Sequence, residues 1–176
     1  MQRAEEPTAV IGTIKRLRGI KMQQSVRRKS QKQENRIAKE LGGKTTPGSG
    51  AQWHSKGDVK AENYLIEAKY TNEAHYPLSL PILTKIEKEA LRENFRIPVL
   101  YVDIQDLKLC VVPEKYITKL NDFNFKKVYS ATSSSVRIHK QGLQDATTKE
   151  LTHVIVSLKG KCYYVMAPEE LDYFCL

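Results

Sequence analysis

Two carboxylates and one lysine lie in, or just before, an apolar run that has the length of a β-strand. Asp58 precedes this run, and Glu67 and Lys69 stand inside it, separated by one residue. Because alternate residues of a strand share a face, Glu67 and Lys69 should point to one side of a sheet and Ile66 and Ala68 to the other. Opposite charges on one face of an apolar strand favour a chemically active site. The alternative is an aspartate in a turn together with a surface ion pair.

The spacing of the two carboxylates suits a divalent metal ion. Asp58 lies nine residues before Glu67, which is enough for one strand, a tight turn and a return strand. Two carboxylates and the backbone carbonyl of Ala68 would offer the hard oxygen ligands that Mg²⁺ prefers, with Mn²⁺ as a substitute. Such an ion polarises a phosphoryl oxygen and lowers the pKa of a bound water. Lys69 would then position the water and stabilise the charge that develops on a phosphate.

Glu34 is a further candidate ligand for this metal. On a helix its neighbours at three, four and seven residues' distance are Ile37, Ala38 and Leu41, which form the apolar stripe. A carboxylate on that inward side is costly unless it is paired or bound to a metal. The alternative is an exposed acid in the first turn, stabilised by the helix dipole.

Hydrophobic periodicity and turn residues predict an α/β fold with a mixed β-sheet flanked by helices, followed by a small β-rich C-terminal extension. A cap at Ser79 and an early Pro81 mark the start of the second helix. The predicted elements are a helix over 31–41, a loop over 47–50, strands over 58–61 and 64–70, a helix over 80–94, strands over 98–104 and 107–112, a short helix over 113–120, an irregular Ser/Thr-rich stretch over 130–150, a hairpin over 152–158 and 161–166, and a terminal helical turn from Pro168.

The positive charge of the chain is concentrated near its N-terminus. Lys and Arg number 29 against 20 Asp and Glu, a net charge of +9. Residues 1–44 hold twelve basic and four acidic residues and so carry +8 of this charge. A basic segment ahead of a nearly neutral remainder favours a polyanionic partner, and DNA first of all. The alternative is a solubilising tail. We expect residues 1–30 to form a largely flexible arm and residues 31–176 a single domain, with a core over 31–104 and an extension over 105–176.

Several classes of function are disfavoured. No apolar run approaches the roughly 20 residues that a membrane-spanning helix needs, so we expect no membrane partner. Gly48 and Gly50 are not followed by Gly-Lys-Ser/Thr, so we expect no nucleotide cofactor. The three cysteines, Cys110, Cys162 and Cys175, have no Cys-x-x-Cys spacing, and buried thiols are expected.

The order of these features resembles the PD-(D/E)XK nuclease superfamily, and more narrowly its archaeal and phage Holliday-junction resolvases. The residues that carry the resemblance are Glu34 on a first helix, the run Pro47-Gly48-Ser49-Gly50, Gly57-Asp58 and Glu67-Ala68-Lys69. A basic segment, Arg27-Arg28-Lys29, runs into the first helix as it does in those enzymes. The match covers about residues 25–104. Gly57 stands where the motif has proline, and the chain after about residue 105 does not align.

The resemblance implies a restriction-endonuclease-like fold and Mg²⁺-dependent hydrolysis of phosphodiester bonds in DNA, with a branched substrate such as a four-way junction and a homodimer as the working form. By position, Asp58 and Glu67 would bind the metal, Glu34 would support it, Lys69 would serve the water, and Ser49 would contact the scissile region. The residues expected to contact DNA are Arg27, Arg28, Lys29, Lys32, Arg36, Lys44, Gln52, Trp53 and Lys56.

Other readings remain open. A different PD-(D/E)XK endonuclease, nicking or restriction-like, has the same motif. A non-catalytic DNA-binding module would use the basic arm as its main device.

Because the N-terminus lacks the apolar core of a secretory signal, we expect the protein to act inside a cell, in the cytoplasm or nucleoid, or as a phage protein inside its host.

Overall fold

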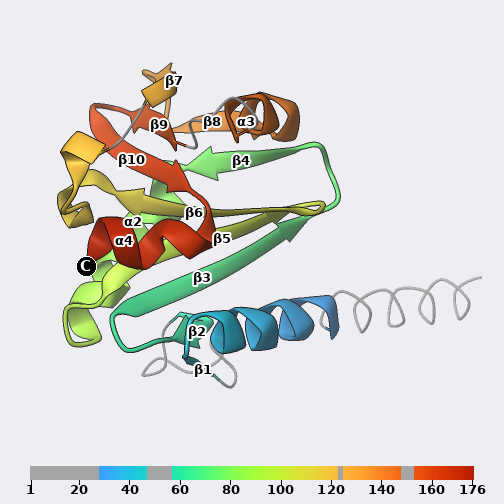
Figure 1. Ribbon diagram of the computed structural model, residues 1–176, viewed down its shortest axis with the longest axis vertical. Helices are drawn as coiled ribbons and strands as arrows, with labels where there is room; N and C mark the ends of the chain where they lie inside the picture. The colour runs from blue at the N-terminus through green and yellow to red at the C-terminus, as the bar shows by residue number, and fades with distance from the viewer. Residues whose placement is uncertain (1–27, 47–56, 123–124, 148–152) are drawn as a thin grey trace, which may run out of the picture.

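A mixed eight-stranded β-sheet organises the chain (Figure 1). The computed structural model describes residues 28–46, 57–122, 125–147 and 153–176. In spatial order the strands are β1 (Lys44–Thr45), β2 (Val59–Lys60), β3 (Tyr64–Thr71), β5 (Ile97–Ile104), β6 (Leu107–Pro113), β10 (Lys161–Met166), β9 (His153–Leu158) and β7 (Phe125–Ala131). The predicted α/β class with a mixed sheet is confirmed.

The strands that carry the candidate chemistry lie at one side of this sheet. β2 and β3 are antiparallel, whereas β3 and β5 are parallel over their whole length, with Glu67 opposite Leu100. Parallel neighbours need a crossover connection. Here the crossover consists of β4 (His75–Ser79) and the helix α2 (Leu80–Arg92). β2 pairs with only the first part of β3, at Leu65 and Ile66, so among the described residues the outer edge of β3 has no strand partner from Glu67 onward.

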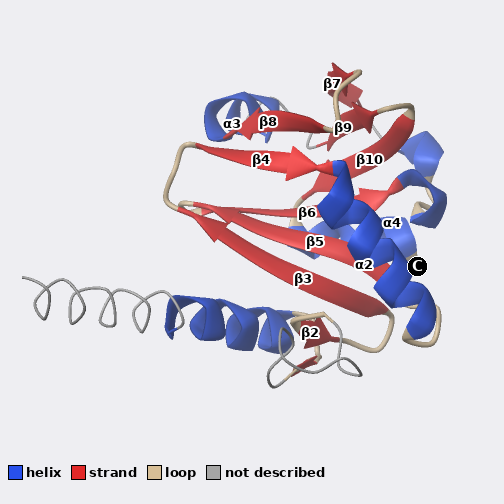
Figure 2. Ribbon diagram, turned by 180° about the vertical axis from the view of Figure 1, so that it is seen from behind, coloured by secondary structure: helices blue, strands red, loops and turns tan. Residues whose placement is uncertain are grey.

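Helices cover the two faces of the sheet. Residues 28–40 are helical and pack with α4 (Leu171–Cys175) in one apolar cluster, which includes Ile37, Ile66 and Phe174. The opposite face packs in a second cluster against α2, α3 (Lys140–Thr147) and the two-stranded sheet of β4 with β8 (Ser135–His139). Figure 1 shows α4 in front of the sheet and Figure 2, from behind, shows α2 in front of it.

Local sequence explains where the first helix ends. Ile37 and Ala38 are buried on its inner side, and the chain leaves the helix at Gly42, whose φ of +62° lies in the left-handed region that favours glycine. At Gly43 a Cβ atom would lie 2.8 Å from the carbonyl oxygen of Lys60. Glycine therefore lets the chain turn closely past β2 and enter β1.

The second helix begins where the sequence predicts but is held differently. Ser79 occupies the N-cap position without a side-chain capping hydrogen bond. Instead the N–H of Leu80 donates to the carbonyl of Ser134, at 2.8 Å. The helix ends at Arg92, two residues before the predicted Asn94, because Asn94 has a left-handed φ of 58°.

The β-rich extension expected over 105–176 forms part of the main sheet. β6 pairs with β5 and with β10, and β10 pairs with β9, so these strands continue the main sheet. The physical reason is the edge of β6, whose backbone groups would otherwise be unpaired in the apolar interior.

Two local predictions were wrong, and one strand was missed. The stretch 130–150 contains part of β7, all of β8 and α3 rather than irregular chain. β4 was missed because the strand that it pairs with, among the described ranges, is β8, which lies far away in sequence. The helix predicted over 113–120 is two 3₁₀ turns, η1 (Glu114–Tyr116) and η2 (Leu120–Asp122). The predicted hairpin is present as β9 and β10, and the terminal turn as η3 (Pro168–Glu170) followed by α4.

Candidate active site

Asp58 lies at the point where β2 ends its pairing with β3. Its N–H donates to the carbonyl of Ile66 at 2.8 Å, and its side-chain Oδ2 accepts the N–H of Ala68 at 2.8 Å. Its carbonyl accepts the N–H of Thr46, at 2.9 Å. The backbone around Asp58 is thus bound on both sides, and its carboxylate is fixed beside the free edge of β3.

Glu67 is a largely buried carboxylate that contacts two lysines. Its side chain is 10% exposed, and its Oε1 accepts from Lys69 Nζ at 2.8 Å. Lys85, from α2, lies with its Nζ 3.5 Å from each carboxylate oxygen. The ion pair with Lys69 follows from their shared face on β3, which the sequence predicts. The opposite face of β3, with Ile66, packs in the first apolar cluster.

Tyr76 of β4 is a further neighbour of Glu67. Its side chain is buried, and burial raises the pKa of Tyr76 to about 12. The negative charge of Glu67 acts on that pKa in the same direction, so the phenol and the carboxylate are close neighbours. Glu67 therefore lies near Tyr76 of β4 as well as Lys85 of α2.

Glu34 approaches from the helix of residues 28–40 and is half-buried. Burial raises the pKa of Glu34 above its ordinary value of 4.5, the Asp58 and Glu67 carboxylates raise it further, and Lys69 lowers it. These influences place Glu34 near all three residues. Its position within the helix, six residues after the first one described, excludes the reading as a first-turn acid.

Gln33 joins this helix to the C-terminal part of β3 through a hydrogen bond. Its side chain is 7% exposed, and Nε2 donates to the carbonyl of Lys69 at 2.9 Å. A cavity of about 490 Å³ lies alongside, between the first turns of the described helix and the end of β3. Lys29, Gln33, Lys69 and Tyr70 are among the residues that line it. Space for a ligand thus lies next to Lys69.

The carboxylates fit a divalent cation in their chemistry, although they are not gathered around one point. Among the described residues, no three His, Cys, Asp or Glu side chains lie close enough together to hold a metal ion. Asp58 and Glu67 instead hold a backbone N–H and two ammonium groups. Burial and, after it, repulsion from Asp58 and Glu67 raise the pKa of Glu34, and a bound cation would relieve that repulsion. Hard oxygen donors in this number suit Mg²⁺ or Mn²⁺.

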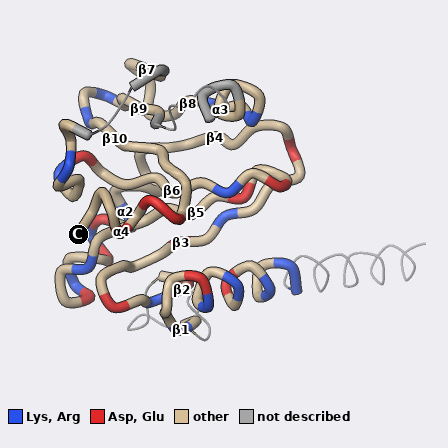
Figure 3. The backbone as a smooth tube through the Cα atoms, in the orientation of Figure 1, with Lys and Arg blue, Asp and Glu red and all other residues tan. Residues whose placement is uncertain are grey.

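Only some of the residues expected to contact DNA belong to the described part of the chain. Arg27, Ser49, Gln52, Trp53 and Lys56 lie outside the described residues. Of the others, Arg28, Lys29 and Lys32 are exposed on the first helix, and Lys44 is exposed on β1. Figure 3 shows the basic positions along that helix.

Arg36 has a structural partner instead of a free guanidinium. Its Nη2 donates to both carboxylate oxygens of Asp103, at 2.9 and 2.8 Å, and Asp103 is 6% exposed. The guanidinium also lies over the ring of Tyr101, 5.6 Å from its centre. The pairing with Asp103 raises the pKa of Arg36 against the opposing effect of burial. Arg36 therefore ties the first helix to β5.

Sequence reasoning missed Lys85, the second cation at Glu67. A signal was present, since Lys85 directly precedes the buried Ile86 and lies four residues before the buried Glu89. That pattern places Lys85 at the border of the apolar stripe. Which strand the border faces depends on how α2 packs, and the helical pattern alone does not contain this information.

A scan against protein-family models and a search of curated proteins each find no match for this chain. No helix in the described part of the chain is long and apolar enough to cross a membrane.

Proposed function

We propose that this protein is a divalent-metal-dependent DNA endonuclease of the PD-(D/E)XK type. The observation that carries the proposal is that Asp58, Glu67 and Lys69 lie on or beside the outer edge of β3 and that the charges of all three reach Glu34 on the first helix. These groups come from three elements, and the motif that predicts them spans 36 positions from the first to the last. A surface ion pair alone would not explain why the charges of Asp58 and Glu67 both act on the pKa of a third carboxylate, Glu34.

The arrangement of the surrounding elements supports the finer fold assignment. A helix is followed by the antiparallel strands β2 and β3, a crossover through α2 and the parallel strand β5. This is the order that the resemblance to restriction-endonuclease-like proteins leads us to expect over residues 25–104. The strands β6, β10, β9 and β7 extend the sheet beyond that core.

Each residue has a distinct part in the proposed reaction. Asp58 and Glu67 would hold Mg²⁺ or Mn²⁺, with the carbonyl of Ala68, and Glu34 would assist them. A bound divalent ion supplies polarisation of the phosphoryl oxygen and a lowered pKa for its water. Lys69, placed at 2.8 Å from Glu67, would orient the attacking water and stabilise negative charge on the phosphate. Ser49 would contact the scissile region.

We further propose a four-way DNA junction as the substrate and a homodimer as the working form. Resolution of a junction requires two symmetric incisions, whereas one chain carries one set of Asp58, Glu67 and Lys69. A twofold dimer supplies two sites in matching orientation. A nicking or restriction-like enzyme of the same superfamily would share the site and differ in this preference.

A non-catalytic DNA-binding protein is the second candidate. The observation in its favour is that Glu67 already contacts the two ammonium groups of Lys69 and Lys85. In that case the cluster would be a structural ion pair, and DNA binding would depend on the exposed cations alone.

The test is the digestion of a labelled four-way junction, a matched duplex and a single strand, each with Mg²⁺ and with chelator. We expect Mg²⁺-dependent cleavage, strongest on the junction, and its loss in Asp58→Asn with DNA binding kept. Asp106→Asn is the matched control, because the Asp106 side chain is 78% exposed and pairs only with Lys140 among the contacts of the described residues. Cleavage in full chelator, or by Asp58→Asn, refutes the proposal. Binding without cleavage of any of the three DNAs favours the second candidate.

A further inference from the structure

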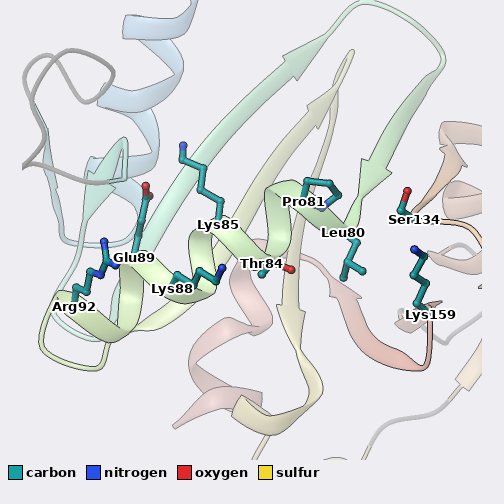
Figure 4. Close-up of a pocket in the computed structure, with 9 residues that line it drawn as sticks. All are labelled: Leu80, Pro81, Thr84, Lys85, Lys88, Glu89, Arg92, Ser134 and Lys159. Atoms are coloured by element: carbon teal, nitrogen blue, oxygen red, sulfur yellow. The ribbon is translucent and has the colours of Figure 1, made fainter.

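A groove runs along the exposed side of α2, and one of the residues that line it, Lys85, also contacts Glu67 (Figure 4). Its volume is about 620 Å³. One wall is α2 itself, and the other includes Ser134 and Lys159 from the turns that follow β7 and β9. In Figure 4 the Lys85 side chain extends from α2 toward the strand that carries Glu67, while Lys159 stands across the groove.

The walls of the groove are fixed by backbone hydrogen bonds. The N–H of Leu80 donates to the carbonyl of Ser134 at 2.8 Å, which joins the start of α2 to the turn after β7. The N–H of Lys159 donates to the carbonyl of Ala131 at 3.2 Å, which joins the β9–β10 turn to the end of β7. The groove is therefore formed before any ligand binds.

The groove is strongly basic. Lys85, Lys88 and Arg92 recur at helical spacing on α2 and thus lie on one side of it. With Lys159 they place four cations against a single lining carboxylate, Glu89, a net charge of +3. Glu89 is 8% exposed, so the cations dominate the surface that a ligand meets.

These cations are available to a ligand. Lys88, Arg92 and Lys159 are exposed, and within the described part of the chain none of them takes part in a salt bridge. Like charges that are gathered on one surface repel one another and attract a ligand of the opposite charge. A polyanion is the ligand that complements it.

Lys85 connects the groove with the chemistry. Its Nζ lies 3.5 Å from both oxygens of Glu67, and the rest of its side chain, 54% exposed overall, lines the groove. From Lys85 to Arg92 the helix rises by about 10 Å, at 1.5 Å per residue. At about 3.4 Å of axis per phosphate, one DNA strand presents about three phosphates over that length.

We infer that this groove binds the phosphodiester backbone of the DNA strand that leads away from the candidate active site. Lys88 and Arg92 contact successive phosphates, Lys159 contacts the strand from the other wall, and Lys85 lies between the groove and the carboxylates. The inference rests on the proposed function for the identity of its ligand, and it adds a binding surface on the face of the sheet opposite to α4.

The experiment measures DNA binding in chelator, so that cleavage plays no part. The anisotropy of a fluorescein-labelled DNA duplex gives the affinity at a series of salt concentrations. Lys88→Gln and Arg92→Gln should each make the slope of log affinity against log salt shallower by about 0.9, and the double variant by about 1.8. The charge-conserving variants Lys88→Arg and Arg92→Lys should keep the slope.

Lys119→Gln is the matched control. Lys119 lies over the ring of Tyr173 in α4, 4.0 Å from its centre, and so on the other face of the sheet. Its substitution should leave the slope unchanged. A double variant with the slope of the wild type overturns the inference, and so does a control that loses as much as Lys88→Gln.

The two proposals fail separately. If the wild type cleaves DNA with Mg²⁺ while the groove variants keep their slope, the groove is refuted and the nuclease stands. If the groove variants lose slope while the wild type cleaves no DNA, the nuclease is refuted and the groove stands as a DNA-binding surface.

Discussion

Removing Lys69 and Lys85 singly and together tests how Glu67 is kept charged inside the protein. At an effective dielectric constant of about 20, the distances of 2.8 and 3.5 Å correspond to gross attractions of about 6 and about 5 kcal/mol. Desolvation and solvent screening offset most of each, because Lys69 is 34% and Lys85 54% exposed. The two attractions are nevertheless similar, so either lysine alone can compensate the carboxylate.

We therefore expect strong non-additivity. Lys69→Met or Lys85→Met alone should lower the free energy of unfolding by about 1 kcal/mol or less, the range of partly exposed ion pairs. The double variant leaves the Glu67 side chain, 10% exposed, without a cation and should lose about 3–5 kcal/mol. With about 1 kcal/mol for each single variant, the coupling energy is about 1–3 kcal/mol, and it is larger if the single losses are smaller.

Urea denaturation of the four proteins, followed by circular dichroism, measures this cycle. A second cycle, which pairs Lys69→Met with Lys88→Met, should be additive. Lys88 lies on α2 as Lys85 does, but it makes no salt bridge to Glu67 or to any other residue in the described part of the chain. If the losses in the Lys69 and Lys85 cycle simply add, Glu67 is not shared between two cations and the description of the site is wrong. In cleavage assays Lys69→Met should also lose about 10²–10³-fold in rate, the cost of removing one preorganised charge-stabilising donor.

Two further predictions concern Glu34 and the assembly of the protein. The pKa of Glu34 is raised in the folded state, so the ionised form of Glu34 destabilises the folded protein. This loss of stability grows as the pH rises from the ordinary Glu pKa of 4.5, and it is complete above the raised pKa. Thermal unfolding should therefore show Glu34→Gln melting above the wild type at neutral pH, with the gap closing in acid; a lower melting temperature at neutral pH would contradict the assignment. Light scattering of the full chain should give about twice the monomer mass, and a monomer that binds junction and duplex equally would remove the resolvase substrate class while leaving the nuclease proposal in place.

Much of the architecture could be read from local patterns. The first helix, β2, β3, α2, β5, β6 and the β9–β10 hairpin all have their own periodicity, caps or turn residues. Glycine at Gly42 and proline at Pro81 mark boundaries, because each restricts the backbone by itself. β4 and β8 escaped notice because each is short, and each is stabilised mainly by the other across 60 residues of chain.

The contacts of the candidate site also divide into those that local sequence patterns predict and those that only the tertiary structure shows. That Glu67 and Lys69 share a face follows from the two-residue period of a strand, and so the sequence by itself determined that the two side chains could form an ion pair. Only the tertiary structure decided that Lys85 of α2 meets Glu67, that Arg36 is bound to Asp103, and that Lys159 faces α2 across a groove. These contacts join segments whose separation in sequence carries no periodic signal. They depend on which strand each helix covers and on the order of strands in the sheet, which the packing of the whole chain determines.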